Sequence, residues 1–150
     1  MQSSSRRRAI RNLAVLTAAL TSLPLRSIAA EKVPVAIKGY DPVAYFTLGK
    51  PTRGRQDIWY EWDERRYLFS SAEHRERFKA DPVRYAPQFP DFCAMSLTRG
   101  EIVDANPENW LVADGKLYMF GKSVGPDLFQ QNLAENVDSA NRHRSLVQKR

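Results

Sequence analysis

The stretch Tyr67–Asp81, YLFSSAEHRERFKAD, is the most informative for the class of the fold, because its pattern predicts a strand that passes directly into a helix. Its first residues are aromatic or aliphatic, as in a buried strand. The segment S-S-A-E at 70–73 fits a capping box, in which a serine hydroxyl caps the helix and the glutamate reaches back. The helix then places His74 and Phe78 on one face, and Asp81-Pro82 ends it. The stretch predicts a mixed α and β domain.

Two hairpins flank this junction. Ile58–Trp62 and Arg66–Phe69 are runs rich in aromatic residues, and the polar residues 63–65 separate them. Further along, NWLVADGKLYMF (109–120) consists of two strand patterns around Asp114-Gly115. A type I′ turn prefers this pair because both turn residues need a positive φ. Each pattern predicts an antiparallel pair of strands.

The rest of the chain adds helices. The segment DFCAMSLTRG (91–100) fits a helix or a strand, whereas residues 125–148 read as one or two amphipathic helices. No internal repeat or flexible linker is visible, so residues 30–150 are predicted to form a single domain. We expect the α+β class: a small twisted antiparallel sheet with packed helices and a C-terminal helical extension.

Residues 1–29 have the pattern of an export signal. A basic segment containing Arg6, Arg7 and Arg8 precedes an apolar run of 13 residues, which is shorter than the ~20 residues of a membrane-spanning helix. The segment SRRRAIR (5–11) resembles a twin-arginine signal. It predicts a periplasmic or otherwise exported protein, a transient encounter with the twin-arginine export machinery, and no transmembrane span in the mature form. An ordinary secretory signal and an uncleaved amphipathic anchor are the alternatives.

The positive charge of the chain belongs mainly to this leader. The formal net charge is +6, and residues 1–29 hold five arginines and no acidic residue. Without them the chain is close to neutral, and no basic stripe interleaved with aromatic residues remains. The charge pattern therefore gives no support to nucleic-acid binding.

A family resemblance emerges from the segments taken together. KGYDPVAYF (38–46), YLFSSAEHRERFKADPVRYAPQF (67–89), FCA (92–94) and DGKLYMF (114–120) resemble the YHS-domain family, specifically its small exported members. The resemblance implies a YHS/TRASH-like core. Metal-binding members of that family carry D-P-V-C and Y-x-F-C-S-x-x-C, and their cysteines ligate the metal.

This sequence keeps the pattern but changes the ligands. Ala44 stands at the first cysteine position, Ser70 at the next, and His74 at the last. Alanine has no donor atom, and a serine hydroxyl is a poor ligand for a soft metal. The resemblance therefore implies the scaffold without the thiolate site of the metal-binding members.

Cys93 is the only cysteine of the chain and lies outside that older ligand set. It cannot form an internal disulfide. With Met95 it offers two soft donors, which share one face in a strand but diverge in a helix. The alternative is that Cys93 is a small buried core residue. Asp91, two residues before it, would disfavour a reactive thiolate.

Three functional hypotheses follow. The first is a small binding module for a transition metal, copper or zinc, with Cys93, His74 and Asp41 as ligands at one edge of the sheet and no catalytic residue. The second is a metal-free interaction or structural domain that has lost the metal ligands of the family. The third is a thiol-dependent redox enzyme built on Cys93.

Overall fold

The computed structural model describes residues 32–148. The predicted leader, with Arg6, Arg7 and Arg8, lies outside the described residues. Lys32–Arg150 group into one compact unit. Within 32–148, no helix combines the length and the apolar character that crossing a membrane requires.

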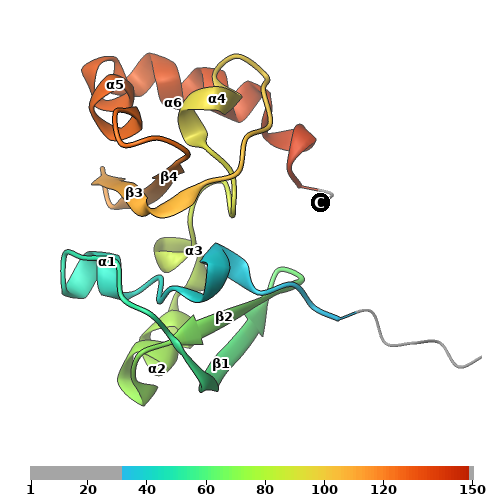
Figure 1. Ribbon diagram of the computed structural model, residues 1–150, viewed down its shortest axis with the longest axis vertical. Coiled ribbons are helices and arrows are strands. Elements are labelled where there is room, and N and C mark those ends of the chain that lie inside the picture. The colour runs from blue at the N-terminus through green and yellow to red at the C-terminus, as the bar shows by residue number, and fades with distance from the viewer. Residues whose placement is uncertain (1–31, 149–150) are drawn as a thin grey trace, which may run out of the picture. The chain divides into compact units, whose positions relative to one another are not determined.

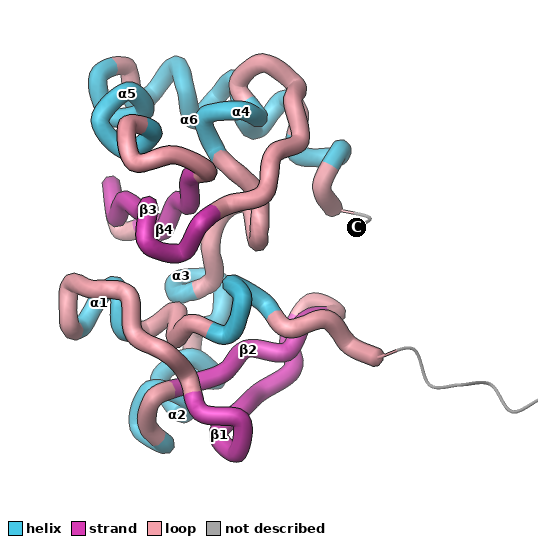
Figure 2. The backbone as a smooth tube through the Cα atoms, in the orientation of Figure 1, coloured by secondary structure: helices cyan, strands magenta, loops and turns pink. Residues whose placement is uncertain are grey.

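The described chain belongs to the α+β class, as predicted. Its strands form two antiparallel sheets of two strands each, β1–β2 and β3–β4, and short helices pack beside them (Figure 1; Figure 2). In chain order the elements are η1 (Ala36–Gly39), α1 (Ala44–Thr47), β1 (Arg55–Trp62), β2 (Arg65–Phe69), α2 (Ala72–Ala80), α3 (Pro82–Tyr85), α4 (Ala94–Leu97), β3 (Asn106–Ala113), β4 (Lys116–Phe120), α5 (Gly125–Gln131), α6 (Leu133–Arg142) and η2 (Arg144–Leu146).

Both predicted hairpins form, and both turns contain two residues with positive φ. Asp114 (φ 50°) and Gly115 (φ 70°) join β3 to β4, as the type I′ pattern predicts. Asp63 (φ 50°) and Glu64 (φ 58°) join β1 to β2 in the same way, although neither residue is a glycine. Local turn chemistry therefore sets the register of each hairpin.

The strand-to-helix junction forms one residue later than the predicted capping box. Ser71 is the N-cap of α2, and its Oγ accepts the backbone N–H of His74 at 3.1 Å. Glu73 pairs with Arg77 instead of reaching back to the cap. Ser70, the first residue of the predicted capping box, is not the cap, so its hydroxyl is available for another hydrogen bond. This one-residue shift turns the Ser70 hydroxyl toward the interior of the fold.

The ambiguous segment 91–100 becomes helical, and the C-terminal region forms the predicted helices. Ala94–Leu97 is the single turn α4, with Cys93 as its N-cap in extended backbone conformation (φ −70°, ψ 113°). The C-terminal residues form α5 and α6, followed by the short η2. Cys93 thus lies at a helix boundary. Neither the shared face expected in a strand nor the divergence expected in a helix therefore describes how Cys93 and Met95 are placed.

The structure repeats one unit, although no repeat was visible in the sequence. We call residues 34–80 the first repeat and residues 87–131 the second. In each, a single helical turn precedes a hairpin of an eight-residue and a five-residue strand, and a helix follows it (Figure 1). The isolated bridges also recur in matching pairs: Val35 with Arg66 and Pro87 with Leu117 (parallel), Tyr40 with Arg53 and Phe92 with Asp104 (antiparallel).

Backbone hydrogen bonds give the alignment between the repeats residue by residue. The N–H of Asp41 donates to the carbonyl of Thr52 at 2.8 Å, and the N–H of Cys93 donates to that of Val103 at 2.7 Å. Both residues lie just before the short helix of their repeat: Asp41 three residues before α1, and Cys93 as the N-cap of α4. Cys93 therefore holds in the second repeat the position that Asp41 holds in the first.

Aromatic packing repeats as well, and it fixes the alignment of the following helices. Phe78 stacks on Tyr67 and Phe69 of its hairpin, with ring centroids 4.7 and 5.3 Å apart. In the second repeat, the ring of Phe129 packs on a tyrosine and a phenylalanine of the hairpin, with centroid distances of 5.1 and 5.3 Å. Those two partners are Tyr118 and Phe120. Since aromatic pairs favour such tilted contacts, both helices dock on their hairpins in one manner.

The buried hydrophobic residues form two clusters, one for each repeat. Strand β4 contributes to both, because it is buried on both faces. Leu117 and Met119 pack in the cluster of the first repeat, whereas Tyr118 and Phe120 pack in that of the second. Successive strand residues point to opposite faces, so one strand serves both. The two repeats therefore share a strand.

The Tyr67 side chain carries a buried hydroxyl without a hydrogen-bond partner among the described residues. Burial, with a smaller effect from the Asp91 carboxylate, raises the pKa of Tyr67 far above its ordinary value of about 10. The folded chain therefore keeps this phenol proton to a higher pH than the unfolded chain. By proton linkage, stability is lost as the pH rises above about 10.

We expect Tyr67→Phe to flatten this alkaline loss by about 1.4 kcal/mol per pH unit. At pH 7 it should stabilise the fold by about 1 kcal/mol, because no unpaired hydroxyl stays buried. Urea unfolding between pH 7 and 11 measures both effects. Tyr60→Phe, on the partly exposed part of β1, is the control. A large loss of stability in Tyr67→Phe at pH 7 would contradict the prediction.

Candidate functional site

A buried carboxylate forms the centre of the candidate site. Asp41 is fully buried (0% exposed), at the turn before α1. Its Oδ1 accepts the backbone N–H groups of Val43 (2.9 Å) and Ala44 (3.3 Å), which start the helix and have no intrahelical acceptor. Asp41 thus fixes the start of α1 in the way that an N-cap does.

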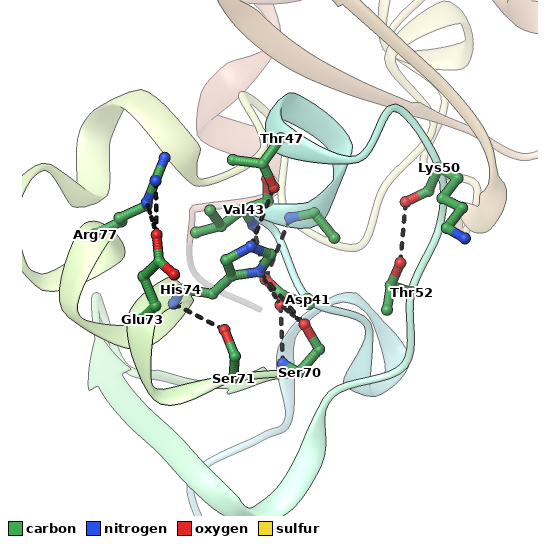
Figure 3. A network of polar contacts seen from close by, with 11 residues as sticks. Asp41, Val43, Thr47, Lys50, Thr52, Ser70, Ser71, Glu73, His74 and Arg77 are labelled. Carbon is green, nitrogen blue, oxygen red and sulfur yellow. Dashed lines mark hydrogen bonds and ion pairs between the residues drawn. The ribbon is translucent and has the colours of Figure 1, made fainter.

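The second oxygen of Asp41 connects α1 to the β2–α2 junction. Oδ2 accepts the backbone N–H of Ser70 at 2.8 Å and its hydroxyl at 2.6 Å. The Nδ1 of His74 lies 2.6 Å from the same oxygen (Figure 3). Five donors therefore converge on one carboxylate, which offers about four lone-pair positions. The hydrogen-bonding capacity of Asp41 is used up.

His74 is held at both ring nitrogens. Its Nδ1 faces Asp41, and its Nε2 lies 3.1 Å from the Oγ1 of Thr47 on α1. Thr47 also donates its hydroxyl to the carbonyl of Val43 at 3.1 Å. The side chain of His74 is only 10% exposed. The ring therefore ties the first turn of α2 to both ends of α1, as Figure 3 shows.

The order carboxylate, imidazole, hydroxyl is also that of a hydrolase triad. A nucleophilic hydroxyl has to give its proton to the imidazole. The Thr47 hydroxyl is instead anchored on the backbone carbonyl four residues earlier, as threonines in helices often are. The arrangement is better suited to locking helix α1 onto α2 than to catalysis.

Cys93 lies in the other repeat. It is 5% exposed and belongs to the second core cluster, with Phe92 and Ala94. A cavity of about 290 Å³ adjoins it, and Met95 and Ser96 of α4 line the same space. Cys93 is a buried residue, as one of the alternatives held, yet its side chain faces a hollow.

The predicted metal ligands are therefore only partly brought together. Asp41 and His74 are in contact, whereas Cys93 is in the second cluster. Over residues 32–148, no group of three or more histidine, cysteine, aspartate and glutamate side chains is placed to hold a metal ion. The repeat explains this separation. Cys93 occupies in the second repeat the position that Asp41 occupies in the first, so the two side chains belong to different units and do not contribute to one site.

Sequence reasoning missed two parts of the site. Ser70 was read as a helix cap and a substituted ligand, and Thr47 was not considered. The signal for Thr47 was its position four residues after Val43 in a short apolar segment, which suits a hydroxyl that bonds its own helix. Its proximity to His74 depends on tertiary packing and has no local signal.

Comparison of the chain with family models, with curated proteins and with solved structures gives no match in any of the three.

Proposed function

We propose that this chain is a small binding module that works without a metal ion at the ligand positions of the YHS family. The observation that carries the proposal is the closed network of Asp41, Ser70, His74 and Thr47. Every oxygen and ring nitrogen at its centre already has a partner within the protein. The network takes the place in the fold that the resemblance gives to a metal site.

The donor set supports this proposal over metal binding. Zinc needs four ligands, and a structural site takes them from cysteine, histidine and carboxylate side chains. Here Asp41 has no free lone pair, and the Nδ1 of His74 is held by Asp41. Only the Nε2 of His74 could face a metal, after leaving Thr47. One nitrogen donor leaves most of a coordination shell to water.

A buried polar network that is fully satisfied also has a structural role. It joins α1, β2 and α2 around a single carboxylate, where metal-binding relatives would use thiolates around a metal. Binding is then left to other surfaces of the module. The predicted export of the protein is compatible with this role, since no disulfide is available to stabilise the fold.

Metal titration of the full chain tests the proposal. We expect zinc to bind no tighter than about 1 μM. For both zinc and copper(I), the titration curve should be the same in wild type and His74→Gln. His143→Gln, which changes the only other histidine, is the matched control. Circular dichroism of each variant verifies folding.

One pattern would overturn the proposal. It is stoichiometric zinc or copper(I) binding that His74→Gln abolishes and His143→Gln retains. Such a result would place a metal at His74 and require Asp41 to exchange its internal partners for the ion.

A further inference from the structure

The second repeat contains a cavity where the first repeat contains its polar network. The cavity has a volume of about 290 Å³, close to the lower limit for small-molecule sites. It adjoins Cys93, which is the counterpart of Asp41. Two glycines, Gly121 and Gly125, also line it.

The alignment of the repeats explains why the space is empty of side chains. Phe69 and Phe120 are equivalent, so the residues that follow them, Ser70 and Gly121, are equivalent too. Phe78 and Phe129 are equivalent as well. The residues four positions before them are His74 and Gly125, which therefore correspond. The second repeat therefore has glycine at both positions where the first has Ser70 and His74. The hydroxymethyl and imidazole groups that fill this place in the first repeat have no counterpart in the second.

Neither glycine could be replaced without a steric conflict. A Cβ on Gly125 would lie 2.7 Å from the Cβ of Phe120, and one on Gly121 would lie 3.0 Å from the backbone oxygen of Asp104. The backbone approaches its neighbours closely at both sites, so the hollow follows from the packing of the second repeat.

The wall also holds two polar side chains in largely buried residues, although the Ser96 hydroxyl is not closed off from solvent. Ser96 is 8% exposed and Cys93 is 5% exposed, and no side-chain hydrogen bond involves either one in the described part of the chain. A hydroxyl and a thiol facing one cavity thus offer two donors to an occupant.

Apolar side chains form much of the cavity lining, which also contains three charged residues. Val103, Val124 and Leu128 line the cavity and are 43%, 52% and 41% exposed. Exposed apolar side chains gathered at one opening are typical of a binding site. Arg99 and Glu101 both line the cavity and pair with each other at 2.8 Å, so the remaining charge of the lining is that of Lys122, which takes part in none of the ion pairs within 32–148.

We propose that this cavity binds a small monocarboxylic acid with a short hydrocarbon chain. The valines and Leu128 cover the chain, and Lys122 attracts the carboxylate, to which Ser96 and Cys93 can donate hydrogen bonds. The same cation disfavours a metal ion at the sulfur atoms of Cys93 and Met95. The inference rests on the proposed binding-module function and adds the class of ligand.

The experiment uses hexanoate as the probe, with 1-hexanol and hexylammonium as controls of equal chain length. Isothermal titration calorimetry of the full chain should show binding of one hexanoate per protein, with 1-hexanol weaker and hexylammonium weakest. Hexanoate should also slow alkylation of Cys93 by iodoacetamide, since the thiol faces the occupied space. Loss of the alkylation signal in Cys93→Ala verifies the assignment.

Lys122→Ala tests the recognition of charge on an exposed residue that the fold does not need. It should weaken hexanoate binding about three- to fivefold, the scale of one exposed ion pair, and leave 1-hexanol unaffected. Lys50→Ala, an exposed lysine of the first repeat, should change neither. Equal affinity for hexanoate and 1-hexanol would overturn the anion proposal while leaving the binding module intact. Failure of every probe to protect Cys93 would overturn the site itself. Neither result depends on metal binding at His74.

Discussion

Asp41→Ala is expected to lower the free energy of unfolding by about 3–5 kcal/mol, the combined cost of leaving several buried donors without an acceptor. The substitution removes the acceptor of the Ser70 hydroxyl and of three backbone N–H groups, those of Val43, Ala44 and Ser70. It also leaves the ring of His74 without its partner at 2.6 Å. Each donor would then be buried without an acceptor, which is costly.

Urea denaturation of the full chain measures this loss. Asp57→Ala is the matched control, because Asp57 is an exposed carboxylate that pairs with Arg55 at the surface; its unfolding midpoint should not move. His74→Gln, which can keep a donor toward Asp41, should be less harmful than Asp41→Ala. If Asp41→Ala behaved like Asp57→Ala, the network could not be what holds α1 to α2.

Phe78→Ala and Phe129→Ala should each cost about 3–5 kcal/mol, the range for truncating a buried phenylalanine. Both side chains are fully buried (0% exposed) and stack on a tyrosine and a phenylalanine of the preceding hairpin. Because they hold equivalent positions in the two repeats, we expect the two losses to be similar. A cavity should remain in either case, since the rings that surround each phenylalanine cannot collapse into the space.

The control for these variants is Val83→Ala, which truncates a side chain that is 70% exposed and should have little effect. Chemical denaturation followed by tryptophan fluorescence and by circular dichroism gives the free energies. If Phe129→Ala left stability unchanged while Phe78→Ala did not, the second repeat would not contribute to the cooperative fold. The shared strand β4 argues for a single unfolding transition in the wild type.

Much of the fold was predictable because its signals are local. Asp114-Gly115 specifies a turn through the backbone conformations that its own residues accept. Asp81-Pro82 ends one helix, and the Asp81 carboxylate then starts the next by accepting the N–H of Arg84. The capping box was misplaced by one residue, because Ser70 and Ser71 are both suitable caps. The bond from Ser70 to Asp41, distant in sequence, decided between them.

The repeat was missed because its equivalent positions differ in chemistry. Asp41, Ser70 and His74 of the first unit correspond to Cys93, Gly121 and Gly125 of the second. Between the start of β1 and the end of α2, five residues recur at one spacing: the series Trp59, Asp63, Tyr67, Phe69 and Phe78 is matched by Trp110, Asp114, Tyr118, Phe120 and Phe129. Five scattered identities are a weak signal in sequence, although the tyrosine and the two phenylalanines of each series carry the packing.

Local sequence signals specify the α+β class, the two hairpins, the helix that follows β2, and a single cysteine with no partner for an internal disulfide. Each of these depends on residues that are neighbours along the chain. Tertiary packing, in contrast, brings Asp41 into contact with His74, places Cys93 in the other core cluster, and leaves a cavity beside Cys93, Gly121 and Gly125. These relations arise when separate segments pack, and packing depends on the volume and hydrogen bonds of side chains far apart in the sequence.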